Sequence, residues 1–337
     1  MTPWMNETNE LIHDGARRRS RRLQSYIAIF LAFASFTGLS YRALDRAYAS
    51  FGCYSSAATA DEFLAYCASP QFGDYEHGAY YYDFEPTAVA SLLRADVVFF
   101  GSSRLQFALS TPAFARYFAQ RSIRPYLLGF GYYEPGAFPV ALIRKYHIAP
   151  KAIVINADPF FKNISTGLVR VLSRWRAIPE LFEYWQKKYF EAVLPWICTA
   201  HPALCRPAIR SLYRTRRDGA WTAHNDLVSQ GYPLEAASMI YTREMTATDQ
   251  DFAEQFIRES GAPRSCIVLT SVPNSAINSE AYVAEMGRLL GVHVSLPRLD
   301  GLMTFDGSHL TSASADRWSE AFLADIDSPL TACVRKR

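Results

Sequence analysis

Short apolar runs alternate with segments of helical spacing from about residue 93 to residue 330. Each run is bounded by polar or turn-forming residues, which is typical of buried strands in a parallel sheet. The predicted strands lie at 97–100, 126–128, 152–155, 267–270 and 292–296. The predicted helices lie at 112–118, 136–146, 251–260, 280–290 and 314–326. This alternation predicts an α/β domain of three layers, in which helices cover both faces of a parallel sheet.

The longest apolar segment, 23–41, lies near the N-terminus and directly follows an arginine-rich stretch. About 20 apolar residues are needed to span a bilayer as a helix, so this segment predicts a single transmembrane helix. Because five arginines lie within 17–22, we expect residues 1–22 to be a cytoplasmic basic tail and the rest of the chain to lie outside. Two alternatives remain open, since residues 20–22 resemble a twin-arginine export signal and residues 47–49 resemble a cleavage site.

Two stretches depart from the alternating pattern. Residues 42–92 are polar and aromatic with several glycines, and we interpret them as an extracytoplasmic lead-in. Residues from about 163 to 248 are rich in Trp, Tyr and Arg and predict helices inserted between two strands. These helices either form a lid or acceptor surface over a site, or simply pad the core.

Composition narrows the possible partners. Half of the 337 residues are hydrophobic, which supplies a sizeable core, and the formal net charge is only +3. Since that small excess is concentrated in the N-terminal arginines, we predict no nucleic-acid surface. Gly129 and Gly131 do not match a dinucleotide-binding fingerprint, so no cofactor is expected.

Six cysteines favour an exported protein, because disulfides form and persist outside the cytoplasm. Pairing by proximity joins Cys53 with Cys67, Cys198 with Cys205 and Cys266 with Cys333, although the sequence alone cannot choose among the possible connectivities. No two cysteines have C-x-x-C spacing. We therefore predict no metal site.

Residues with catalytic chemistry follow the first and the last strands of this array. The first predicted strand ends in Gly101-Ser102-Ser103, and Asp306 and His309 follow the last one. Ligands of open parallel sheets bind outside the carboxyl ends of the strands, so we expect these side chains to meet. A Ser on a strand-to-helix turn, a His base and an Asp that orients the His make up a nucleophilic triad. We predict Ser103 as nucleophile, His309 as base and Asp306 as orienting acid, with Ser102 as the competing nucleophile.

The same residues carry a resemblance to a known family. Residues 97–104 read Val-Val-Phe-Phe-Gly-Ser-Ser-Arg and resemble the first block of SGNH (GDSL-like) hydrolases, and Asp306-x-x-His309 resembles their last block. Together with the N-terminal apolar segment and the Ile-Asn-Ala-Asp-Pro-Phe-Phe stretch at 155–161, the Gly-Ser-Ser-Arg variant resembles membrane-tethered members associated with acylation of cell-envelope glycans. The resemblance covers about 96–326, apart from the insertion, and implies an SGNH-like domain at 93–330.

The resemblance also implies an oxyanion hole. The family's second block places a Gly after the second strand, which Gly129 matches, with Gly131 as the other candidate. Its third block supplies an Asn, which Asn156 matches by position, although the spacing from Asn156 to Asp158 departs from the family's Gly-x-Asn-Asp pattern. The expected oxyanion donors are therefore Ser103, through its backbone N–H, together with Gly129 and Asn156.

These features predict serine-dependent transfer or hydrolysis of ester-linked acyl groups, with acetyl as the expected group, on an envelope polysaccharide or glycolipid. Transfer and hydrolysis share an acyl-enzyme and both stay open. The alternative is a non-catalytic assembly or glycan-binding subunit that has kept the fold. The expected partners are the glycan, the membrane and a multi-spanning acyl-donor protein. The expected location is the inner membrane, with the domain on the periplasmic side.

Overall fold

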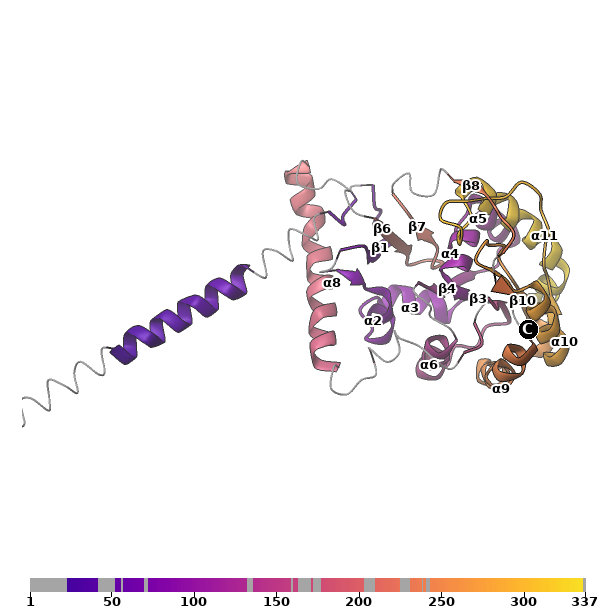
Figure 1. Ribbon diagram of the computed structural model, residues 1–337, viewed down its shortest axis with the longest axis horizontal. Coiled ribbons are helices and arrows are strands. Elements are labelled where there is room, and N and C mark those ends of the chain that lie inside the picture. Colours follow the sequence, from indigo (N-terminus) through magenta and orange to yellow (C-terminus); the bar gives the residue numbers. More distant parts are fainter. Residues whose placement is uncertain are drawn as a thin grey trace, which may run out of the picture. The chain divides into compact units, whose positions relative to one another are not determined.

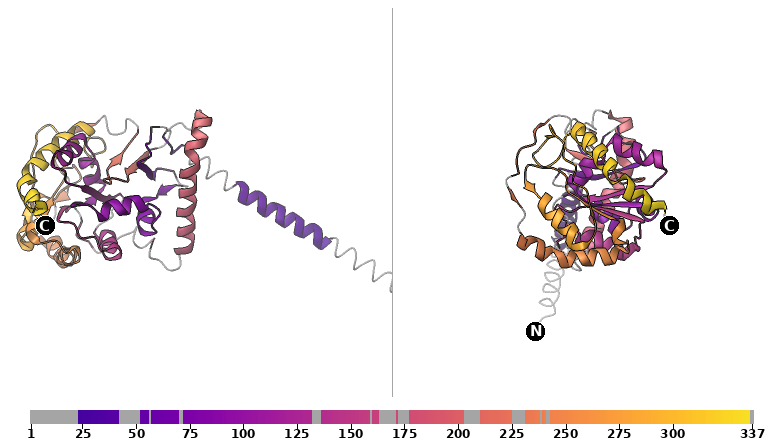
Figure 2. Two further views of the ribbon diagram at one scale, coloured as in Figure 1. Left: turned by 180° about the vertical axis from the view of Figure 1, so that it is seen from behind. Right: turned by 90° about the vertical axis from the view of Figure 1, so that its right-hand side faces the viewer.

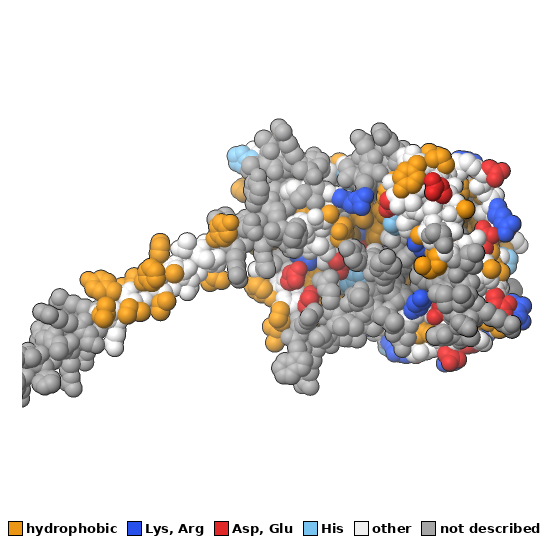
Figure 3. Space-filling model, in the orientation of Figure 1, with side chains coloured by type: hydrophobic (Ala, Val, Ile, Leu, Met, Phe, Trp, Pro, Cys, Tyr) orange, Lys and Arg blue, Asp and Glu red, His pale blue; other side chains and the backbone are white. Residues whose placement is uncertain are grey.

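The computed structural model describes residues 23–41, 52–55, 57–69, 72–131, 136–158, 160–162, 171, 177–202, 210–224, 231–237, 239–240 and 243–335. Contacts divide the chain into two units, Met1–Ser50 and Phe51–Arg337. In the first unit, the helix Leu23–Tyr41 is long and apolar enough to cross a membrane. Its hydrophobic side chains are exposed along its whole length (Figure 3). The predicted N-terminal apolar helix is thereby confirmed.

A parallel sheet organises the second unit, and the predicted α/β class is confirmed (Figure 1). Among the described residues its strands are β3 (Val97–Ser102), β4 (Pro125–Phe130), β5 (Ala152–Asn156), β10 (Ile267–Thr270) and β12 (His293–Val294). They lie in the order β12-β10-β5-β3-β4, and every neighbouring pair is parallel. Counted along the chain this is the order 2-1-3-4-5 of a doubly wound sheet, whose ligand site lies where the order reverses, between β3 and β5.

Helices cover both faces of this sheet, because side chains of each central strand alternate between two apolar layers (Figure 2). Phe99 and Val154 pack into the first layer, and Phe100 and Ile155 pack into the second. The helices of the first layer are α4 (Ser103–Leu109), α5 (Pro112–Arg121) and α11 (Ser312–Arg335). Those of the second are α6 (Ala137–Tyr146), α9 (Arg243–Ser260) and α10 (Glu280–Leu290).

The lead-in at 42–92 contributes more to the fold than the sequence indicates. Its described part contains β1 (Glu62–Cys67), β2 (Gly73–Asp74), α2 (Glu76–Tyr81) and α3 (Pro86–Leu93). β1 pairs antiparallel with β6 (Ser211–Thr215), and both belong to a second sheet of order β2-β1-β6-β7, where β7 is Trp221–Thr222. Since the partner strand is far away in the sequence, no local pattern could reveal this pairing.

The insertion at about 163–248 is only partly helical, which corrects the expectation of helices alone. Its described part contains α8 (Ala177–Ala200), but also β6, β7, β8 (Tyr232–Pro233) and β9 (Met239–Ile240). The short strands pair with distant partners, β8 with β13 (Met303–Thr304) and β9 with β11 (Ile277–Asn278). α8 lies at the opposite end of this unit from α11 (Figure 1).

Two predicted disulfides are present. Cys53 bonds Cys67 at the end of β1, and Cys266 bonds Cys333 of α11. Cys198 is also disulfide-bonded, and its predicted partner, Cys205, lies outside the described residues. The bridges fit a protein folded outside the reducing cytoplasm.

A buried ion pair connects the lead-in and the insertion to the edge of the parallel sheet. Arg214 of β6 is fully buried, and its guanidinium lies 2.7 Å from Glu76 Oε2 of α2. The same guanidinium donates hydrogen bonds to the carbonyl oxygens of Leu127, at 2.9 Å, and Gly129 on the edge strand β4. Trp221 donates a further hydrogen bond to Glu76 Oε2 at 3.2 Å. Arg214 thus satisfies an otherwise exposed sheet edge while its own charge is compensated.

Candidate active site

The turn between β3 and α4 separates the roles of the two serines. Ser102 is the N-cap of α4, and its side chain accepts a hydrogen bond from the Arg104 backbone N–H at 3.3 Å. Ser103 is the first residue of the helix, and its hydroxyl lies 2.8 Å from His309 Nε2. A Cβ at Gly101 would lie 2.9 Å from Leu105 Cβ and 3.0 Å from that of Asn156, so only glycine fits this crowded turn. The geometry therefore selects Ser103 over Ser102 as the serine next to the base.

The three predicted catalytic side chains form one hydrogen-bond chain. His309 Nδ1 lies 2.7 Å from Asp306 Oδ2, while His309 Nε2 faces Ser103 Oγ. The other carboxylate oxygen of Asp306 accepts the backbone N–H groups of Ser308 and His309, each at 2.9 Å. With Nδ1–H donating to the carboxylate, Nε2 is left as the acceptor for the serine proton.

The surroundings of Asp306 keep it ionised. Burial raises its pKa, but hydrogen bonds from the His309 ring and from two backbone N–H groups offset this, so its pKa lies below the ordinary value. An ionised carboxylate beside Nδ1 holds the imidazole in one orientation and stabilises the imidazolium that forms when His309 takes a proton.

Two aromatic rings contact the His309 ring. Phe305 stacks on the His309 ring with 5.5 Å between centroids, and Phe107 meets the same ring edge-on at 4.9 Å. Trp221 of the second sheet extends this group, since its ring lies 5.4 Å from that of Phe107. The rings limit water around His309 and provide an apolar wall beside Ser103.

Arg104 connects the serine turn to two other strand ends. Its guanidinium donates to Asp158 Oδ2 at 2.8 Å and to Ser308 Oγ at 3.0 Å. Asp158 is buried and also accepts a hydrogen bond from Asn274 Nδ2 at 3.0 Å. Burial raises the pKa of Asp158, and Arg104 acts in the opposite direction. Arg104 is therefore a positioning residue that holds the Ser103 turn against the loop of Asp306 and His309.

Sequence reasoning assigned no role to Arg104, Asp158, Asn274 or Phe107. A signal was present, because Arg104 and Asp158 directly follow the ends of β3 and β5, and Phe107 lies one helical turn after Ser103. The ion pair itself depends on which strands are neighbours, and that information is not local.

Of the predicted oxyanion donors, Ser103 and Asn156 lie at the switch point between β3 and β5, and Gly129 lies in the edge strand β4. Asn156 ends β5 and is fully buried, its Oδ1 accepts the Val272 N–H at 3.0 Å, and its Nδ2 has no partner among the described residues. Gly129 lies in β4 opposite Gly101. Its carbonyl oxygen accepts hydrogen bonds from Gln106 of α4 and from Arg214 of β6. Their role at an oxyanion stays a prediction.

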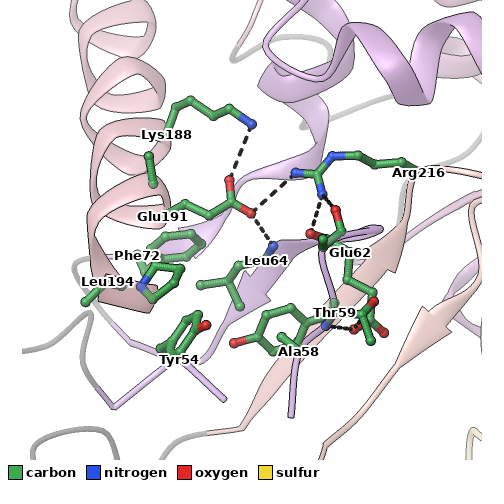
Figure 4. Close-up of a pocket in the computed structure, with 14 residues that line it drawn as sticks. Tyr54, Ala58, Thr59, Glu62, Leu64, Phe72, Lys188, Glu191, Leu194 and Arg216 are labelled. Atoms are coloured by element: carbon green, nitrogen blue, oxygen red, sulfur yellow. Dashed lines mark hydrogen bonds and ion pairs between the residues drawn. The ribbon is translucent and has the colours of Figure 1, made fainter. Parts of the chain in front are cut away.

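Other polar clusters in the described residues are held by internal partners. Ligand atoms of Asp74, Glu76 and His77 lie within 4.8 Å of one another, as in many cation sites, but Glu76 Oε2 is already bonded to Arg214 and Trp221. A pocket of about 200 Å³ lies between α8, β1 and β6 (Figure 4). In its lining Lys188 and Arg216 pair with Glu191, and Glu62 pairs with His224 outside it. None of the triad residues lines this pocket.

A Ser–His–Asp hydrogen-bond chain at the carboxyl edge of a parallel α/β sheet is an arrangement that can carry out nucleophilic acyl transfer. Comparisons with protein-family models, with curated proteins and with solved structures give no match for this chain. The function inferred for it therefore rests on its own residues.

Proposed function

We propose that this protein is a serine-dependent acyltransferase or esterase of the SGNH type. The observation that carries the proposal is the hydrogen-bond chain from Ser103 Oγ through His309 to Asp306. Two further features support it, the 2-1-3-4-5 strand order and the use of Ser102 as a helix cap, which leaves Ser103 as the serine that faces the base.

The first half-reaction forms an acyl-enzyme. Ser103 Oγ attacks the ester carbonyl carbon while its proton passes to His309 Nε2, and the charge on the carbonyl oxygen is stabilised by the predicted donors Gly129, Asn156 and the Ser103 N–H. The tetrahedral intermediate then expels the alcohol oxygen, which takes the proton from His309 and leaves as a hydroxyl group. The acyl group remains on Ser103.

The second half-reaction determines whether the outcome is transfer or hydrolysis. His309 removes a proton from an acceptor hydroxyl or from water, the resulting oxygen attacks the acyl carbon, and Ser103 recovers its proton as it leaves. The aromatic wall of Phe107, Phe305 and Trp221 would exclude water and favour a carbohydrate acceptor. Acetyl is the acyl group we expect, and an envelope polysaccharide or glycolipid is the expected substrate.

The site would work outside the cytoplasm. The helix Leu23–Tyr41 would anchor the chain in the inner membrane with residues 1–22 inside, and the domain would lie on the periplasmic side. The disulfides support an oxidising compartment. A multi-spanning membrane protein would then be the donor of activated acyl groups.

A fluorophosphonate probe tests the proposal, because it reacts with an activated serine and not with an ordinary one. We expect labelling of the intact protein that is lost in Ser103→Ala and kept in Ser102→Ala. Ser102 is the matched control, since it lies in the same turn but caps α4 instead of facing His309. Absence of labelling in correctly folded wild-type protein would replace the enzyme with a non-catalytic glycan-binding or assembly subunit.

A further inference from the structure

One face of α8 exposes a series of large apolar side chains. They recur at the i, i+3, i+4 and i+7 spacing of a single helical face. Their exposed fractions lie between 43% and 80% for Ile178, Leu181, Phe182, Trp185, Tyr189 and Trp196, which we call the α8 stripe. Rings within it stack, with centroids 6.3 Å apart for Phe182 and Trp185 and 6.0 Å apart for Trp185 and Tyr189. An exposed apolar surface of this extent usually marks an interaction site.

The opposite face of α8 is firmly attached to the domain. Tyr184 is fully buried, and its ring lies 5.9 Å from the rings of both Tyr75 and Tyr82. Leu194 and Cys198 are buried on the same side of the helix. The buried face of α8 therefore fixes which face, the stripe, is exposed.

Three charged side chains of α8 bond to the body of the domain, and two of them, Lys188 and Glu191, point into the pocket beside β1 (Figure 4). Lys187 donates to the carbonyl oxygen of Asp74 at 2.8 Å, Lys188 pairs with Glu85, and Glu191 accepts the Leu64 N–H at 2.9 Å. A sugar-binding platform needs hydrogen-bonding groups beside its aromatic rings, and here these three groups are already used within the domain. A hydrocarbon surface needs no hydrogen-bonding groups from its binding site, so the stripe suits an apolar surface better than a glycan.

The chain itself brings such a surface within reach. Only ten residues, 42–51, separate the apolar helix Leu23–Tyr41 from the first described residue of the domain. Fully extended, they span at most about 35 Å, so a bilayer that holds the helix is present at high effective concentration near α8. Trp and Tyr, which make up half of the stripe, are the side chains that favour the boundary between headgroups and acyl chains.

We propose that α8 lies on the bilayer surface with its stripe inserted at the headgroup boundary, which gives the domain a second membrane contact besides the anchor. This inference rests on the anchoring part of the proposed function and not on its chemistry. α8 carries three glutamates and two lysines, so its binding is driven by apolar and aromatic area and does not require anionic lipid.

The test uses the full chain reconstituted in phosphatidylcholine vesicles, with a protease site introduced between residues 42 and 50. After cleavage we expect the wild-type domain to float with the vesicles. The stripe variant Phe182→Ser/Trp185→Ser/Tyr189→Ser should be released, with the ratio of bound to free protein lower by about 100-fold. The control Leu93→Ser/Tyr232→Ser/Met239→Ser changes three similarly exposed apolar residues elsewhere and should stay bound.

A second measurement follows the tryptophans of the stripe and keeps aromatic rings at those positions. In an uncleaved chain that carries Trp4→Phe/Trp175→Phe, brominated lipids should quench part of the tryptophan emission, and adding Trp185→Phe/Trp196→Phe should remove that part. Trp221 and Trp318 are buried in the domain and should not be quenched.

Several results would overturn the inference. If the uncleaved chain floats but the wild-type domain is released on cleavage, the anchor is supported and the proposed contact between the α8 stripe and the bilayer is refuted. Binding only to native membranes would point to a protein partner, and binding only to anionic vesicles would point to charge. An uncleaved chain that does not float would refute both the membrane anchor and the membrane contact of the α8 stripe. None of these outcomes would change the fluorophosphonate labelling of Ser103, which tests the chemistry separately.

Discussion

Removal of the buried Arg214 guanidinium should destabilise the protein more than any surface change of the same size. Arg214→Met keeps most of the side-chain volume but leaves Glu76 buried without its cationic partner. Breaking a buried ion pair by removing one partner costs about 3 to 5 kcal/mol. The carbonyl oxygens of Leu127 and Gly129 keep one hydrogen bond each, from Gln106, so they add little to this cost.

Thermal unfolding of the purified full chain measures the effect. For a unit of this size, about 1 kcal/mol shifts the unfolding temperature by roughly 2 to 4 °C, so Arg214→Met should unfold roughly 6 to 20 °C below wild type. Glu76→Gln added to Arg214→Met should recover about 1 to 2 kcal/mol, because the uncompensated buried charge is then gone. The double variant should thus be more stable than the single one.

Arg217→Met is the matched control for Arg214→Met. The Arg217 side chain is 74% exposed and pairs with Asp218 at the surface, where such a pair contributes at most about 1 kcal/mol. If Arg214→Met unfolds at the same temperature as Arg217→Met, the reasoning about this buried pair is wrong. A double variant less stable than Arg214→Met would contradict the account of the Glu76 charge.

Four further predictions concern the site, the α8 pocket and the disulfides. Ser103→Ala and His309→Ala should each lower ester turnover about 10³-fold or more with little further loss in the double variant, and Asp306→Asn should be milder; additive losses would contradict a triad. Arg104→Lys should slow fluorophosphonate labelling about tenfold without changing the unfolding temperature by more than a few degrees, because a lysine cannot hold both partners of the guanidinium; an unchanged labelling rate would remove its positioning role. Burial, and after it repulsion from Glu85, raises the pKa of Glu191 to about 7. At a pH between the ordinary pKa of a glutamate and this raised pKa, the folded state keeps a proton that the unfolded state has released. Stability should therefore fall by up to about 3 kcal/mol as pH rises from 5 to 8, and Glu191→Gln should remove that dependence; parallel pH curves for the two proteins would contradict it. Alkylation of the native protein without reductant should find no free thiol at the four cysteines of the described disulfides, and modification of any of them would contradict the pairing.

Local patterns were sufficient to predict the central sheet and the approximate place of the site. Continuous apolar runs predicted β3, β4, β5 and β10 because a strand buried on both faces excludes polar side chains along its whole length. The ends of parallel strands meet at one edge, so Ser103 could be expected near residues that follow the last strand. The apolar helix Leu23–Tyr41 was equally evident, since its length and composition are properties of one short segment.

Long-range pairing was decided by the tertiary structure alone. The register of β1 against β6, the contact of Arg104 with Asp158 and the burial of Arg214 all join segments whose sequences carry no mark of each other. The same holds for the choice between Ser102 and Ser103, which depends on which hydroxyl caps α4 and which faces His309. The sequence predicted helices in the insertion, but which face of α8 is buried depends on where Tyr184 packs, and only the folded chain determines that.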